Sequence, residues 1–186
     1  MTLSRAFIAI PLPATLSGEL AGLQRQLQHE LPELRPVAAE NLHLTLKFLG
    51  DRDQDQLAKI GQFMLSVAGC QAPFSLRLRG LGSFPDDRHP RVVWLGVQPP
   101  QPLLTFQHQL ARGLAELGGD EEQTLYLPHL TLGRFRRPPA DTSALRNQRA
   151  VDLGPLPVNS LVLYQSRLTP QGAVHQPLTV AMLKGH

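Results

Sequence analysis

Apolar residues in the first part of the chain alternate between the spacing of strands and the spacing of helices. Residues 6–10 form a short apolar run that ends at Pro11 and is typical of a buried strand. Leucines three and four residues apart predict a helix over residues 14–30. The pattern continues with a strand over residues 41–49, a helix over about 54–68 that begins after Asp51 or Asp53, and a strand over 74–81.

The same order of elements recurs in the second part of the chain. It comprises a strand over residues 91–97, a helix over 102–117, a strand over 125–135, a short helix over 141–149 begun by Asp141, and strands over 158–167 and 174–183 joined by a turn at 169–172. The repeat indicates a single α+β domain, residues 1–186, made of two pseudo-symmetric lobes of roughly 1–88 and 89–186. Each half is small for a stable core, so we expect the lobes to pack together.

One tetrad occurs in the middle strand of each half: His43-Leu44-Thr45-Leu46 and His129-Leu130-Thr131-Leu132. Side chains alternate between the two faces of a strand, so the leucines anchor each strand in a core while His and Thr share the opposite face. A pseudo-two-fold axis would place the two His–Thr pairs on opposite walls of one cleft.

This constellation suits phosphoryl chemistry. Histidine has an unperturbed pKa near 6.5, so one imidazole can act as a base while the other acts as an acid. Threonine hydroxyls can donate to phosphoryl oxygens where charge builds up. A single strand histidine is more often structural, so the inference rests on the matched pair. A zinc site would require a third ligand, for which His89, His108 and His175 are the remaining candidates, and we expect no metal.

Composition narrows the class of protein. The single cysteine, Cys70, excludes an internal disulfide framework and a Cys-based zinc site. The chain has no apolar run long enough to span a membrane and no signal-peptide layout, so we expect a cytoplasmic protein. The net charge of +3 is mild, but all except three of the 18 basic residues are Arg, which suits phosphate oxygens. Arg134, Arg136 and Arg137 gather directly after the second tetrad.

The pair of His-x-Thr-x motifs resembles the 2H phosphoesterase superfamily and, more closely, the RNA 2′,3′-cyclic phosphodiesterases, also called 2′-5′ RNA ligases. The similarity extends in order over blocks at residues 5–13, 41–50, 82–85, 91–97, 128–135 and 163–168. It implies a bilobal fold in which two antiparallel sheets line a central cleft, with helices on the outside.

The resemblance also implies an activity, namely metal-independent opening of a 2′,3′-cyclic phosphate at an RNA end to a 2′-phosphomonoester. His43 would donate a proton to the leaving 3′ oxygen, His129 would accept one from the attacking water, and Thr45 and Thr131 would hold the phosphate. The sequence alone leaves the opposite assignment of the two histidines open. Many members also join RNA ends through a 2′-5′ linkage, with a 5′-hydroxyl replacing water. We expect a monomer that acts on RNA ends without a cofactor.

Arg134 and Phe48 are further candidates for substrate binding. Strict alternation directs both side chains toward the core, which favours Phe48 as a core residue over a base-stacking one. A bulge at Gly133 would re-aim Arg134 toward the phosphate or the terminal base; otherwise Arg136 or Arg137 would take that role. Two other functions stay open: a non-catalytic module that binds RNA ends, and a phosphodiesterase acting on small cyclic nucleotides.

Overall fold

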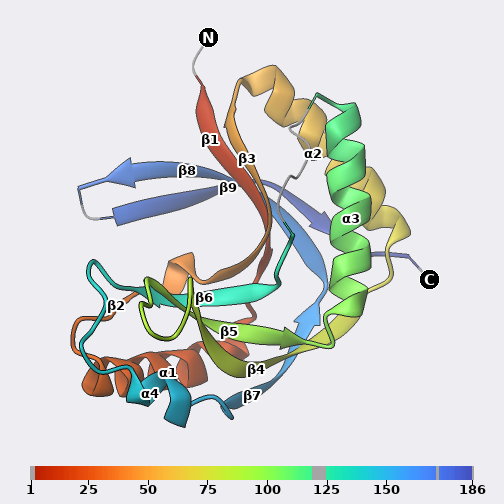
Figure 1. Cartoon of the computed structure of the whole chain (residues 1–186). Coiled ribbons are helices and arrows are strands. Elements are labelled where there is room, and N and C mark those ends of the chain that lie inside the picture. The colour runs from red at the N-terminus through yellow and green to blue at the C-terminus, as the bar shows by residue number, and fades with distance from the viewer. Residues whose placement is uncertain (1–2, 119–124, 171, 186) are drawn as a thin grey trace.

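Two antiparallel sheets make up the framework of the computed structural model, which describes residues 3–118, 125–170 and 172–185 (Figure 1). Sheet A has the strand order β3-β1-β8-β9, formed by His43–Arg52, Ser4–Pro11, Ser160–Thr169 and Gly172–Met182. Sheet B has the order β2-β6-β5-β4-β7, formed by Arg35–Pro36, His129–Arg134, Val92–Gln98, Phe74–Phe84 and Asp152–Val158. The α+β architecture expected from the alternating periods is thus confirmed.

In the described part of the chain, four α-helices cover the outside of the sheets. They are α1 (Ser17–Glu30), α2 (Gln54–Cys70), α3 (Gln101–Glu116) and the short α4 (Ser143–Asn147). Helices α2 and α3 pack beside sheet A, and α1 and α4 lie beside sheet B (Figure 1). The Gln24 side chain ties α1 to sheet B by donating to the backbone oxygens of Val37 and Leu132, both at 2.8 Å. None of the helices in the described chain is long and apolar enough to cross a membrane.

Local signals predicted most element boundaries correctly. Asp53, one of the two residues expected to begin the second helix, caps α2 in a capping box with Gln56. Asp141 does not cap α4; Thr142 is the cap residue, while Asp141 accepts hydrogen bonds from Ser143. The strand expected from residue 125 begins only at His129. Strand β7 was not predicted because Pro155 and Pro157 argue against a strand, although prolines are tolerated at a sheet edge.

The capping box makes a testable contribution to stability. Asp53→Ala is expected to lower the free energy of unfolding by about 1 kcal/mol, because it leaves the backbone N–H of Gln56 without its carboxylate acceptor. Urea denaturation of the folded protein measures this loss. Asp55→Ala, which removes a carboxylate from the same turn without breaking a cap, is the control. An equal loss in both variants would show that charge, rather than capping, carries the effect.

The two sheets do not coincide with the expected lobes of residues 1–88 and 89–186. Strand β4 lies in the first half of the sequence but pairs with β5 and β7 in sheet B. Conversely, β8 and β9 lie in the second half but join sheet A by pairing β8 with β1. Each sheet therefore needs strands from both halves. Neither half of the sequence forms a complete sheet by itself.

A continuous core joins both sheets and their helices. Its members include Ile8 and Leu163 of sheet A and Leu95 of sheet B, all completely buried. The leucines of both tetrads also belong to this core: Leu44, Leu46, Leu130 and Leu132. The His and Thr side chains of each tetrad therefore lie on the opposite face of their strand. We call this the inner face of each sheet.

Candidate active site

The first tetrad lies on β3, with His43 and Thr45 half-buried on the inner face of sheet A. The His43 imidazole stacks on the ring of Phe7, with centroids 4.7 Å apart and planes inclined by 28°. Phe7 is itself only 3% exposed, so it provides a fixed apolar wall. The imidazole also forms a hydrogen bond with the backbone of Asn41, two residues earlier. Together these contacts fix the orientation of the His43 ring.

The second tetrad lies on β6, with His129 and Thr131 on the inner face of sheet B. The His129 Nδ1 is 2.7 Å from the backbone oxygen of Leu127, again two residues earlier. Because that oxygen can only accept, Nδ1 carries the proton and Nε2 is left for chemistry. Phe84 meets the His129 ring edge-on, with centroids 5.0 Å apart. The two histidines are thus held by equivalent backbone contacts and different aromatic neighbours.

Trp94 completes the inner face of sheet B beside the second tetrad. It lies opposite Thr131 on β6 and opposite Gly82 on β4. A Cβ atom at Gly82 would come within 2.3 Å of the indole ring, so only glycine leaves room for it. The structure requires Gly82 because of this close approach.

The two tetrad strands are neighbours even though they belong to different sheets. Strands β3 and β6 contact each other between the sheets (Figure 1). The Tyr126 hydroxyl, just before β6, donates to the backbone oxygen of Thr45 at 2.8 Å. The structure therefore brings together the strands that carry both His–Thr pairs.

Both strands have a register shift at the last residue of the tetrad. In β3 the register with β1 slips between Ala9–Thr45 and Ile8–Lys47, which leaves Leu46 without an opposite residue. In β6 the register with β5 slips between Trp94–Thr131 and Val93–Gly133, which leaves Leu132 unpaired in the same way. Such a bulge reverses the alternation of the residues that follow it, and in β3 a second shift, between Phe7–Phe48 and Ala6–Gly50, restores the alternation after Leu49.

The bulges place Phe48 and Arg134 on the inner faces. Arg134 is exposed and lies opposite Val92, on the same face as Trp94, so the bulge expected near Gly133 is found at Leu132. Phe48 lies opposite Phe7, with ring centroids 6.2 Å apart, and is 71% exposed. The interpretation of Phe48 as a core residue is therefore wrong. Lys47 takes the buried position instead.

The inner faces lower the proton affinity of both imidazoles. Burial, with a smaller contribution from the charge of His175, lowers the pKa of His43 to about 4. Burial also lowers the pKa of His129, and Arg134 adds to that effect. Both rings are therefore mainly neutral near pH 7 in the free protein, and each can accept a proton.

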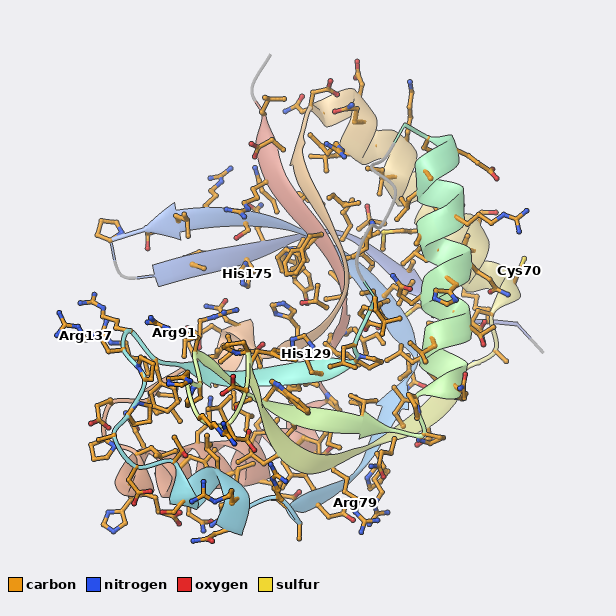
Figure 2. All side chains as sticks on the ribbon, in the orientation of Figure 1. Cys70, Arg79, Arg91, His129, Arg137 and His175 are labelled. Carbon is orange, nitrogen blue, oxygen red and sulfur yellow. The ribbon has the colours of Figure 1, made fainter. Side chains whose placement is uncertain are left out.

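Sequence reasoning missed the place of His175, which it considered only as a metal ligand. The structure puts His175 on β9, where its ring meets His43 edge-on with centroids 5.3 Å apart. Figure 2 shows His175 and His129 between the two sheets. Strand alternation gave no signal here, because the position depends on how the last hairpin pairs with β1. In the described part of the chain, no three His, Cys, Asp or Glu side chains are grouped as metal ligands.

Comparison with known proteins shows the family to which the chain belongs. The family model of the 2′-5′ RNA ligase superfamily matches residues 12–169. The RNA 2′,3′-cyclic phosphodiesterase of Methanothermobacter thermautotrophicus is 34% identical over 96% of this chain and 98% of its own length. Among solved structures, TT0787 of Thermus thermophilus has a TM-score of 0.84 at 30% identity, covering 97% of this chain and 98% of that one. E. coli LigT complexed with 3′-AMP has a TM-score of 0.75 at 30% identity, covering 98% and 99%.

Proposed function

Because the chain belongs to the 2′-5′ RNA ligase superfamily, we propose that it is a phosphodiesterase that opens RNA 2′,3′-cyclic phosphate ends to 2′-phosphomonoesters. Family membership confirms the resemblance drawn from the sequence, and the solved relatives confirm the two-sheet fold of the 2H phosphoesterases. The observation that carries the proposal is the juxtaposition of two His–Thr strands with the histidine rings held on inner faces.

In the proposed reaction, His129 acts as the base and His43 as the acid. The Nε2 of His129 takes a proton from water as the water oxygen bonds to phosphorus. The bond from phosphorus to the 3′ oxygen breaks, and His43, in the protonated form that the bound phosphate anion favours, supplies the proton that this oxygen needs to leave. Proton exchange with solvent then restores both rings. With a 5′-hydroxyl in place of water, the same steps would form a 2′-5′ linkage.

The remaining inner-face residues bind the phosphate and the nucleoside. The hydroxyls of Thr45 and Thr131 donate to the non-bridging oxygens, where negative charge increases in the transition state. Arg134 contributes a positive charge beside His129. None of these roles needs a metal ion. The exposed ring of Phe48, next to Phe7, offers the terminal base a surface for stacking.

A bell-shaped dependence of kcat/KM on pH is expected, with its maximum below pH 6.5. Activity falls at low pH when the base is protonated and falls at high pH when the acid loses its proton. Both limbs lie on the acidic side because the pKa values of both histidines are lowered in the free protein. A bound phosphate anion raises both values, so the maximum of kcat should lie at higher pH. A rate that rises monotonically with pH would contradict the scheme.

Phe48→Ala is expected to raise KM for a cyclic-phosphate end roughly 5- to 150-fold, the range set by the loss of one base–aromatic stack of about 1–3 kcal/mol. The turnover number should change little, because Phe48 lies away from the reacting atoms. Phe48→Tyr, which keeps a flat ring, is the control. Steady-state kinetics on a short RNA separates the two parameters, and an unaltered KM in Phe48→Ala would remove this residue from the site.

Product analysis tests the proposed function. A short RNA ending in a 2′,3′-cyclic phosphate is incubated with the protein in the presence of EDTA, and the new end group is identified by mass spectrometry and phosphatase mapping. A 2′-phosphomonoester is expected. Recovery of intact cyclic phosphate on bound RNA would indicate a binding module, and a 3′-phosphate would show that the other bond is cleaved. Turnover of a cyclic mononucleotide but not of RNA would indicate a small-molecule substrate.

A further inference from the structure

Five exposed arginines surround the end of β6 that follows the second tetrad, and we call them the arginine rim: Arg35, Arg91, Arg134, Arg136 and Arg137. Arg35 of β2 lies directly opposite Arg134 in the sheet. The backbone oxygen of Arg91 accepts from Phe135 at 2.9 Å, and its guanidinium donates to the backbone oxygen of Arg136. Hydrogen bonds between neighbouring segments therefore hold the rim together.

The carboxylates of residues 3–118, 125–170 and 172–185 leave the rim arginines without an ion pair. The loop between β4 and β5 contains acids, but Asp87 pairs with Arg149 and Ser83, and Asp86 accepts from the backbone of residues 88 and 89. On the outer part of sheet B, by contrast, Asp152 binds Arg77. The rim is therefore free to bind an external anion.

We propose that the arginine rim binds the phosphodiester backbone of the RNA strand that precedes the terminal cyclic phosphate. This inference rests on the proposed function, since Arg134 connects the rim to His129. Arg91 and Arg137 lie on the side of sheet B that faces the β8–β9 hairpin, as His129 does (Figure 2). A guanidinium binds phosphate oxygens through two parallel N–H groups, and several neighbouring guanidinium groups suit the repeated phosphates of a nucleic-acid backbone. The rim thus selects an oligonucleotide over a mononucleotide.

The double variant Arg136→Ala/Arg137→Ala tests the rim. Its preference for a six-nucleotide RNA over the cyclic mononucleotide, measured as a ratio of kcat/KM, should fall several-fold. The slope of log KM for RNA against log salt should become shallower by about 1.4, from about 0.7 for each lost phosphate contact. Arg25→Ala/Arg112→Ala, on the helices outside the sheets, should keep the wild-type ratio and slope.

An unchanged ratio and slope in the rim variant, or no preference for RNA in the wild-type protein, would overturn this proposal. Fluorescence anisotropy with the same RNA bearing a non-hydrolysable 3′ end measures the affinity of the protein for RNA independently of turnover. Weaker, less salt-dependent binding by the rim variant supports it even if the proposed reaction fails.

A separate observation concerns the β8–β9 hairpin and its contact with the first tetrad. The Asn41 side chain donates to the backbone oxygen of Ala173 at 2.7 Å, which ties β9 to the segment that precedes β3. The backbone of the same Asn41 holds the His43 ring. His175 follows Ala173 by two residues, and its ring meets both Phe7 and His43 edge-on, at 4.9 and 5.3 Å. One residue therefore fixes His43 and His175 relative to each other.

We infer that His175 is a positioning residue for His43, holding the imidazole against Phe7 and opposing the addition of a second positive charge beside it. The Nδ1 of His175 is buried and has no hydrogen-bond partner in the described chain. A hydrogen bond from that atom therefore does not fix the ring, which leaves its packing against Phe7 and His43. The other ionisable side chains on this face of sheet A are Arg5, Asp51 and Tyr164, and those on β6 are His129 and Arg134. The lowered pKa of His43 has His175 as its second cause, after burial.

NMR titration of the His43 ring tests this inference without any substrate. In His175→Phe, which keeps a ring but removes the charge, the pKa of His43 should rise, because a repelling positive charge is gone. Turnover should be retained in His175→Phe but fall several-fold in His175→Ala, with little change in KM. His175→Gln provides a second neutral variant, and His108→Phe on α3 is the control. An unaltered His43 titration in both neutral variants would overturn the proposal.

Discussion

Replacing His129 with alanine is expected to lower turnover of an RNA 2′,3′-cyclic phosphate by about 10²- to 10⁴-fold, the usual contribution of one positioned proton-transfer group. The reason lies in the contact between its Nδ1 and the backbone oxygen of Leu127. This contact leaves Nε2 as the proton acceptor, and no other residue of β6 carries an imidazole. The attacking water would then lack a base.

The loss must be separated from a loss of folding. His129 is half-buried and its side chain is outside the leucine core, so the thermal unfolding midpoint should change little. His89→Ala, at an exposed loop position, is the matched control and should retain full activity. Single-turnover rates on a short RNA measure the chemical step. Activity of His129→Ala within a few-fold of wild type would remove this residue from the reaction.

His43→Ala is expected to cause a loss of similar size, about 10²- to 10⁴-fold in kcat, because the 3′ oxygen would have to leave as an unprotonated alkoxide. The binding of RNA should persist, since Phe48, Arg134 and the threonines are untouched. A fall in kcat with KM preserved would therefore show that the interaction matters in the transition state. Substrate binding and turnover measured on the same preparation provide both quantities.

The double variant His43→Ala/His129→Ala strengthens the test. When two groups act together in one transition state, the effects of removing them on the activation free energy do not add. The fall in kcat of the double variant should therefore be smaller than the product of the two single falls. Fully multiplicative losses would indicate two independent effects. An undiminished rate in His43→Ala would contradict the paired scheme directly.

Much of the fold and the site could be predicted because the signals are local. The spacing of apolar residues predicted three long helices, and the period of two correctly separated Leu44 from His43 and Thr45. The exchange of strands between the sequence halves could not be predicted, because hydrogen-bond partners such as β1 and β8 are far apart in the chain. Strand β7 was missed because its prolines lower the local strand propensity, and the sequence does not show that β7 lies at a sheet edge, where proline is tolerated.

The bulges mark the limit of prediction from periodicity. A one-residue shift reverses the faces of a strand but leaves no composition signal in Leu46 or Leu132. Phe48 and Arg134 stand at the same distance after their histidines, and equivalent bulges bring both to the inner faces. One position carries an aromatic ring and the other a cation. The inner face of sheet A therefore has an aromatic ring that suits a nucleobase, and the inner face of sheet B has a cation that suits a phosphate.

The most direct test of the central claim, that His43 and His129 act as an acid–base pair, uses an RNA end in which sulfur replaces the 3′ bridging oxygen of the cyclic phosphate. A thiolate leaves without a proton, so a missing acid matters little while a missing base still matters. The rates of both alanine variants on the sulfur and oxygen substrates are compared with wild type. We predict that His43→Ala regains most of its lost rate on the sulfur substrate and that His129→Ala does not. Equal losses on both substrates for His43→Ala, or recovery of His129→Ala instead, would contradict the account.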